Sequence, residues 1–287
     1  MSALAWLTAS LLLVRPAVPA PLTRWADVDD TARAQLVAQD ARLPLGQRVV
    51  RTSERFLDAP YLASPLGEGT GWDPDPLFRM DAVDCLTFVE ATLALSLAGS
   101  FEGAQPLLTS LRYDGPADYL HRNHLMEAQW LPSNLRKGFL VDVTHLYGGR
   151  DVVAAEKRLT RRTWQSRSSR ALHLPRSRQP RGTFELPMLP LSRVSAHAAR
   201  IPSGTILVVL REDLPLKPTR ITHLGFVVQK RGRTYLRHAA RGAYSRVVDE
   251  ELDSFLLRHA RYAKWKVTGV ALYAPREPSS VAMVAAP

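Results

Sequence analysis

The chain has 287 residues, with 38 Lys and Arg against 27 Asp and Glu, a formal net charge of +11, and a single cysteine. One cysteine excludes an intramolecular disulfide framework and any zinc cluster built on cysteines. The excess of positive charge favours an anionic partner and leaves open nucleic acid, a membrane surface and bacterial cell wall.

The first 20 residues have the pattern of a secretory signal. Residues 3–14 form an apolar run, ALAWLTASLLLV, and the small residues Val18 and Ala20 follow at a cleavage position. The run is shorter than the roughly 20 apolar residues that a membrane-spanning helix needs. No Lys or Arg precedes it, and Pro21 would follow the cut, so a buried N-terminal helix or an uncleaved anchor is the alternative. We expect a signal peptide over 1–20 and export.

The amino-terminal half is predicted to be mainly helical. Residues 25–57 mix apolar and charged positions in an amphipathic pattern, whereas residues 60–81 are rich in Gly, Pro and Asp and predict an irregular loop. The clearest helix covers residues 84–98, where leucine and valine recur at helical spacing before Gly99.

A basic stretch follows a mixed region over 107–149. Residues 156–182 contain nine Lys or Arg and one acid, with Ser and Pro between them. This composition is typical of a solvated segment, so we expect a poorly packed basic insertion.

The carboxy-terminal part changes to short β-rich runs separated by turn residues. The predicted strands are Thr205–Leu210, His223–Gln229, Thr234–His238 and Val267–Tyr273, with a hairpin turn at 231–233 and a helix over Glu250–Tyr262. Helices followed by antiparallel strands indicate an α+β fold, in a single domain over 21–275 with a frayed tail at 276–287.

Cys85 occupies the position that a nucleophilic cysteine needs. Asp84 is a good N-cap, so Cys85 falls in the first helical turn. There the helix dipole is expected to lower the thiol pKa, and free backbone N–H groups can donate to an oxyanion. The alternative is that Cys85 is only a small buried apolar residue.

Two histidines are candidates for the base and its orienting partner. His223 begins one predicted strand and His238 ends the next across the hairpin. Neighbouring strands lie about 4.8 Å apart, so the two rings are placed to form a hydrogen bond. Taken singly, each histidine has an ordinary surface or packing role as its alternative; together with Cys85 they form a triad.

Three motifs carry a resemblance to a known family. Residues 84–90 (DCLTFVE), 222–227 (THLGFV) and 237–239 (RHA) resemble the catalytic blocks of the NlpC-like cysteine hydrolases, papain-like enzymes of the bacterial cell wall. Residues 64–69 (SPLGEG), 122–124 (RNH) and 130–134 (WLPSN) resemble one branch of that superfamily, N-acetylmuramoyl-L-alanine amidases once classified as a domain of unknown function. The resemblance covers about residues 60–149 and 201–273.

The resemblance implies roles for these residues and a papain-like NlpC-type fold. Cys85 would be the nucleophile, His223 the general base and His238 the residue that orients it. The bond cut would be the amide between N-acetylmuramic acid and L-alanine, in peptidoglycan or a muropeptide. The residues implied to line the substrate cleft are Arg122, His124, Trp130 and Asn134. Ala240 stands where this branch would have Ser, and Glu90 is expected to make a structural hydrogen bond.

Several alternatives remain open at the level of the sequence. A γ-D-glutamyl–diaminopimelate endopeptidase would use the same triad, and an inactive exported cationic wall-binding protein would keep only the cleft. Nucleic acid is not an expected partner, because no nucleic-acid-binding motif accompanies the charge. No HExxH motif or close His and acid cluster appears, so neither metal nor cofactor is expected. We expect the basic stretch to attract anionic wall polymer or a membrane surface, and the protein to be periplasmic or secreted.

Overall fold

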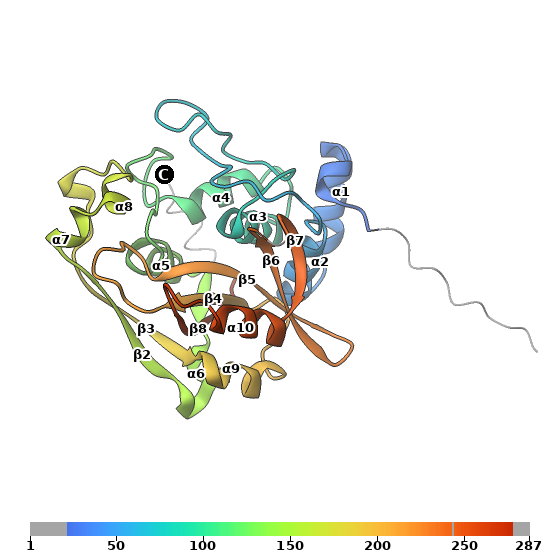
Figure 1. Cartoon of the computed structure of the whole chain (residues 1–287). Helices are drawn as coiled ribbons and strands as arrows, with labels where there is room; N and C mark the ends of the chain where they lie inside the picture. Colours follow the sequence, from blue (N-terminus) through green and yellow to red (C-terminus); the bar gives the residue numbers. More distant parts are fainter. Residues whose placement is uncertain (1–21, 243, 278–287) are drawn as a thin grey trace, which may run out of the picture.

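The computed structural model describes residues 22–242 and 244–277 (Figure 1). The predicted signal peptide over 1–20 and most of the predicted frayed tail lie outside the described residues. The helices are α1 Asp30–Asp40, α2 Leu45–Glu54, α3 Cys85–Leu97, α4 Ala104–Arg112, α5 Leu131–Arg136, α6 Thr144–Gly148, α7 Arg161–Trp164, α8 Arg167–Arg170, α9 Leu191–Ala198 and α10 Leu252–Ala260. The strands are β1 Leu140–Asp142, β2 Val153–Leu159, β3 Gly182–Pro190, β4 Ile206–Arg211, β5 Ile221–Lys230, β6 Arg233–Ala240, β7 Arg246–Glu251 and β8 Val267–Pro275.

The strands form one antiparallel sheet in the order β2-β3-β8-β4-β5-β6-β7, with β1 added beside β8. The α+β expectation is therefore confirmed, while the papain-like NlpC assignment stays a prediction. The four predicted strands correspond to β4, β5, β6 and β8, and the helix predicted over 250–262 corresponds to α10.

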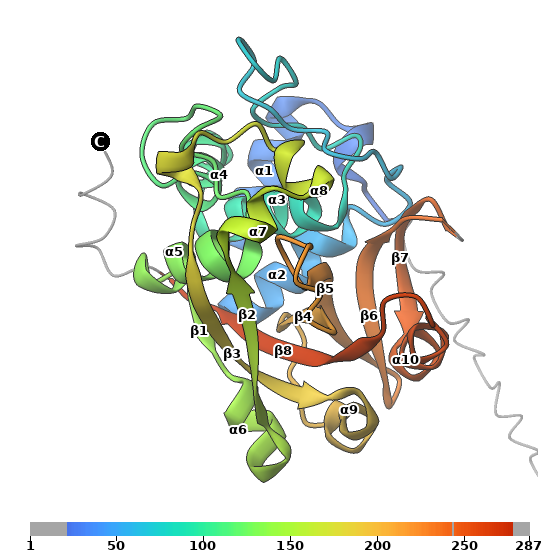
Figure 2. The same cartoon turned by 60° about the vertical axis from the view of Figure 1, so that its left-hand side comes forward.

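Both faces of the sheet are covered, which explains why β4 is buried along its whole length. Ile206 and Val208 face a core shared with α1–α4, whereas Leu207 and Val209 face a second core shared with α9 and α10. Figure 2 shows α6, α9 and α10 on the side of the sheet opposite to α1–α4. A strand buried on both faces reads as a continuous apolar run, as the sequence ILVVL does.

The central helix α3 is mainly apolar, has no exposed polar face and lies buried between α2, α4 and the sheet. Its Phe88 ring contacts Phe226 of β5 edge-on, with ring centroids 5.6 Å apart. A helix with no polar face must pack on every side, and this packing fixes its first turn against β5.

The basic stretch 156–182 is a packed part of the fold, so the expectation of a poorly packed insertion is wrong. Its first residues belong to β2, which pairs with β3 along its full length. Trp164 and Leu159 are buried in a small cluster with Leu125. Lys157 is 1 % exposed because it pairs with Asp213 and donates to the Leu214 carbonyl oxygen at 3.2 Å. The charged run Glu156–Lys157–Arg158, with Lys157 at a buried position, masked the strand pattern.

None of the helices in the described residues is both long and apolar enough to span a membrane.

Candidate active site

Cys85 is the first residue of α3, and its neighbours cap the helix. The Asp84 carboxylate accepts from the Thr87 backbone N–H at 2.8 Å, and Thr87 Oγ1 accepts from the Asp84 N–H at 2.8 Å. This capping box leaves the N–H groups of Cys85 and Leu86 outside its own hydrogen bonds. Both N–H groups lie against the Cys85 sulfur, as does the N–H of Leu224 from β5. The sulfur therefore sits among backbone donors beside the strand that carries His223.

His223 and His238 are in direct contact, as expected from the hairpin. His223 Nε2 lies 2.7 Å from His238 Nδ1, and the two rings stand nearly perpendicular, at 86°. His238 Nε2 lies 3.1 Å from Glu250 Oε2 at the end of β7. These contacts form a chain from a carboxylate through one imidazole to the other.

Gly225 makes this contact possible. The β5–β6 pairing ends at Phe226 opposite Arg237, and Gly225 comes next along β5. A Cβ at Gly225 would lie 2.5 Å from the Arg237 carbonyl oxygen and 2.8 Å from His238 Cβ. The absent side chain allows β6 to approach β5 where the two histidines meet.

Glu250 and Arg258 complete the chain, and the sequence analysis did not identify them. Arg258 donates to Glu250 Oε1 at 3.1 Å and to Oε2 at 2.6 Å. Burial alone would raise the Glu250 pKa, but the hydrogen bonds from His238 and Arg258 lower it, so this carboxylate stays charged. Glu250 is placed by the pairing of His238 with Val248 in β7, a strand the sequence analysis did not predict.

The protonation states of Cys85 and His223 differ from those expected for a thiol activated as a thiolate. Burial, followed by the nearby Asp84 charge, raises the pKa of Cys85 to about 12, so the prediction of a lowered thiol pKa is wrong here. The backbone N–H groups act in the opposite direction without overcoming burial. Burial and the neighbouring His238 lower the pKa of His223 well below its usual value. At neutral pH Cys85 is thus a thiol and His223 a neutral imidazole.

Tyr61 is a second group next to the thiol that the sequence analysis missed. Its backbone pairs with Val83, just before the helix. Burial and the neighbouring Cys85 and Asp84 raise the pKa of its hydroxyl to about 12, so Tyr61 remains a neutral hydrogen-bond donor.

The comparisons with known proteins identify the family. Residues 51–261 match the model of a family described as N-acetylmuramoyl-L-alanine amidase-like. The chain belongs to this family. Membership supports a cell-wall hydrolase of the amidase kind, whose substrate is peptidoglycan. No curated protein matches the sequence.

Solved structures share the fold of this amidase-like protein. A Legionella pneumophila protein of family DUF1460 is 23 % identical, covers 87 % of this chain and 95 % of its own, and has a TM-score of 0.74. An N-acetylmuramoyl-L-alanine amidase from Bacteroides uniformis is 24 % identical, covers 81 % of this chain and 99 % of its own, and has a TM-score of 0.65. A putative xylanase from Bacteroides fragilis is 24 % identical over 78 % of this chain and 99 % of its own, with a TM-score of 0.61.

Two of the predicted substrate residues of this amidase-like protein are buried in its core, and their assignment is corrected. Trp130 is 0 % exposed and donates from Nε1 to Glu90 Oε1 at 2.8 Å. Asn134 is 0 % exposed and donates to the carbonyl oxygens of Leu111 and Trp130. Neither side chain faces a cleft, so both act in packing. The Trp130 contact also shows Glu90 in a structural hydrogen bond, as expected.

The other two predicted substrate residues are largely committed to contacts within the protein. Arg122 donates from Nε to Glu68 at 2.9 Å and from a terminal nitrogen to Asp73 at 2.8 Å. His124 Nε2 lies 2.7 Å from the Tyr119 carbonyl oxygen, and burial lowers the His124 pKa. Arg122 therefore holds the 60–81 loop, which leads into α3, through two ion pairs. Its guanidinium group already has two carboxylate partners within the protein.

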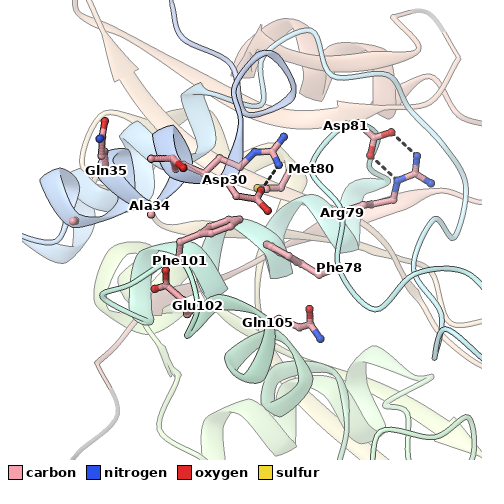
Figure 3. A pocket seen from close by; sticks show the side chains of 13 residues that line it. Asp30, Ala34, Gln35, Phe78, Arg79, Met80, Asp81, Phe101, Glu102 and Gln105 are labelled. Carbon is pink, nitrogen blue, oxygen red and sulfur yellow. Dashed lines mark hydrogen bonds and ion pairs between the residues drawn. The ribbon is translucent and has the colours of Figure 1, made fainter.

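Two of the hollows in the described surface lie in different parts of it, one of them beside the histidine pair. The larger, about 1040 Å³, lies between α1, residues 78–81 and the start of α4 (Figure 3). Four of its five charged groups form ion pairs, Arg33 with Asp30 and Arg79 with Asp81. The smaller, about 450 Å³, is lined by His223 and His238. Only the smaller hollow adjoins the histidine pair.

Among residues 22–242 and 244–277, no group of three or more His, Cys, Asp or Glu side chains is arranged to hold a metal ion.

Proposed function

We propose that this protein hydrolyses the amide bond between N-acetylmuramic acid and L-alanine through a cysteine thioester. The observation that carries the proposal is that the N–H of Leu224 lies against the Cys85 sulfur, while the preceding residue, His223, begins a His223–His238–Glu250 chain of contacts. The amidase-like family supports the choice of bond.

The hydrogen bonds favour one arrangement of protons. The charged Glu250 accepts from His238 Nε2–H, so His238 Nδ1 is the acceptor for His223 Nε2–H. His223 Nδ1 then carries no proton and is the nitrogen that can take one from the Cys85 thiol. A neutral base beside a neutral thiol suits proton transfer during attack rather than a preformed ion pair.

The reaction follows in two halves. The Cys85 sulfur bonds to the amide carbonyl carbon as its proton passes to His223, and the carbonyl electrons move to the oxygen beside the backbone N–H donors. The carbon–nitrogen bond breaks, His223 returns the proton to the leaving amine, and a thioester remains. Water then attacks the thioester, gives a proton to His223, and releases the acid and the Cys85 thiol.

The product spectrum on defined muropeptides tests this proposal. An intact peptide beginning with L-alanine, released from the sugar, is the expected product, whereas free L-Ala-γ-D-Glu would assign the endopeptidase reaction instead. Cys85→Ala should abolish product, and Cys85→Ser should leave it reduced by at least about 10³-fold, because an alcohol is a poorer nucleophile than a thiol in this position. Undiminished hydrolysis by Cys85→Ala would refute the cysteine mechanism.

We also propose that the basic segment 156–182 holds the protein near anionic wall polymer. Arg161, Arg176 and Arg181 line a hollow of about 510 Å³ on this segment, and Arg170 joins them in an adjoining hollow. None of these four side chains pairs with a carboxylate among the described residues. Figure 1 shows α7 and α8 at one edge of the molecule, and none of the four arginines lines the hollow that His223 and His238 line.

Substitution tests this proposal better than deletion, because deletion would remove β2 and buried Trp164. A variant with Gln at all four arginines should bind whole sacculi more weakly at low salt and hydrolyse small fragments normally. A variant in which four exposed lysines or arginines elsewhere on the surface are changed to Gln is the control. Equal loss of sacculus binding and fragment hydrolysis would contradict the proposal.

Export is the remaining proposal, and it rests on the apolar run 3–14 and the small residues Val18 and Ala20. Fractionation of bacteria expressing the whole chain should place the protein outside the cytoplasm, and a chain lacking residues 2–20 should stay inside.

A further inference from the structure

The hollow beside the histidine pair has a cationic lining. His223 and His238 form one wall, and Arg211, Arg241 and Arg258 supply three guanidinium groups. Its other lining residues are Thr222, Ala240, Gly242, His259 and Tyr262. No Asp or Glu belongs to the lining, although Glu250 lies behind Arg258 and pairs with it.

The three arginines differ in how much of their charge is already used. Glu250 neutralises Arg258. Arg211 donates to Thr222 Oγ1 at 2.8 Å and lies over the Tyr262 ring at 5.0 Å, without a carboxylate partner. Arg241 is exposed and makes no ion pair with any of the described residues. The hollow therefore keeps two uncompensated positive charges, and only that of Arg241 is on an uncommitted side chain.

His259 adds an unused polar atom to the same hollow. The residue is 9 % exposed, and its Nδ1 is buried without a hydrogen-bond partner among the described residues. Its ring packs on Phe255 with centroids 4.2 Å apart, which holds it in place. Burial, Arg258 and Arg211 lower its pKa to about 4, so the ring is neutral at pH 7. A buried polar atom left unpaired in a hollow points to a ligand group that would pair with it.

We propose that this hollow binds a carboxylate of the peptide that leaves when the amide is cut. The inference rests on the proposed function, in which His223 returns a proton to the leaving amine. The leaving peptide must then lie on the histidine side of the thiol, and the hollow is lined by both histidines but not by Cys85. Guanidinium groups bind carboxylates through charge-assisted hydrogen bonds, and the residues after L-alanine in a muropeptide carry such groups.

A matched pair of substrates tests the assignment. One is N-acetylmuramoyl-L-Ala-D-Glu, and the other is its diamide, in which both carboxylates are carboxamides. The protein should show a lower KM for the acid. Arg241→Gln should raise the KM for the acid about tenfold with little change in kcat, and should leave the diamide unaffected. Arg241→Lys should recover part of the loss. Arg42→Gln, the same charge change in the turn after α1, is the control.

A binding measurement separates failure of this inference from failure of the proposed function. Calorimetry with the product dipeptide L-Ala-D-Glu and its diamide needs no hydrolysis. Preferential binding of the acid, lost in Arg241→Gln, would support the carboxylate site even if neither substrate were cut. Equal binding, or equal KM for acid and diamide, would overturn the inference while leaving amide hydrolysis intact.

Discussion

Gly225 is the single residue on which the histidine contact most depends, because no side chain fits between β5 and β6 there. In Gly225→Ala, the new Cβ would meet the Arg237 carbonyl oxygen and His238 Cβ, and the strand must shift. We expect kcat/KM to fall at least about tenfold, since displacing an orienting group by a fraction of an ångström weakens proton transfer. Gly46→Ala is the control, because its nearest added contact is an ordinary 3.5 Å. Full activity in Gly225→Ala would show that the His223–His238 contact is dispensable.

The lowered pKa of His223 predicts how activity depends on pH. A base works only without its proton, and a lowered pKa keeps it unprotonated in more acidic solution. The acidic limb of kcat/KM should therefore lie below pH 6.5, the ordinary histidine value. His238, His259, Arg258 and Arg211 surround His223 and disfavour its protonation.

Arg258→Gln checks the electrostatic part of this effect. The change removes one positive charge near His223 and leaves Glu250 free to stabilise a positive charge on the histidine chain. Both consequences raise the His223 pKa, so the acidic limb should move to higher pH in a kcat/KM profile. Movement to lower pH would contradict the assignment of His223 as the base.

Site residues whose role follows from their neighbours in the chain could be predicted from the sequence. Site residues that are brought into place only by the pairing of distant strands could not. Cys85 follows an N-cap, and the two histidines face each other across a hairpin. Glu250 lies beside His238 only because β7 pairs with β6, so no local sequence pattern predicted the contact. Trp130 is buried because its indole N–H bonds to Glu90 within the core, a contact made across 40 positions of the chain.

At the scale of elements, a buried ion pair holds the helices around Cys85 together. Glu90 of α3 is 1 % exposed and accepts from Arg112 of α4 at 3.0 Å, and Arg112 also donates to the Leu66 carbonyl oxygen in the 60–81 loop. Burial raises the Glu90 pKa, and the nearby Arg112 opposes this rise. The pair thus joins two helices and the loop that leads into the thiol.

Glu90→Gln should destabilise the protein by about 3 kcal/mol, because it leaves a buried guanidinium without its counter-charge. Urea unfolding monitored by circular dichroism measures the change. The double variant Glu90→Gln, Arg112→Met should lose less stability than the single variant, since no unpaired charge remains. An equal or larger loss in the double variant would show that the charge pairing is not what stabilises this site.

Strands that form apolar runs could be predicted from the sequence, whereas a strand that carries several charged residues could not. The strands β4, β5, β6 and β8 are apolar runs bounded by turn residues. In β2, by contrast, the charged Lys157 occupies a buried position. The sequence of this strand therefore resembles a solvated run of charged residues. Only the Asp213 carboxylate and the Leu214 carbonyl, 56 and 57 positions away, make that lysine an interior residue.

At the scale of the whole molecule, the strand made last among the described elements lies in the middle of the sheet. β8 pairs with β4 on one edge and with β3 and β1 on the other. A chain ending after Lys266 should therefore show no cooperative thermal transition and no hydrolysis, because β3 and β4 lose the strand that joins them. A chain ending after residue 277 keeps β8 and is the control. A folded, active product of the shorter chain would contradict this account.

The central position of β8 also determines when the sheet can be completed during synthesis of the chain. The ribosome makes Cys85, His223 and His238 well before Val267, but β3 and β4 are joined only once β8 lies between them. We therefore expect a chain that is still being synthesised to lack the complete sheet until Val267–Pro275 has left the ribosome.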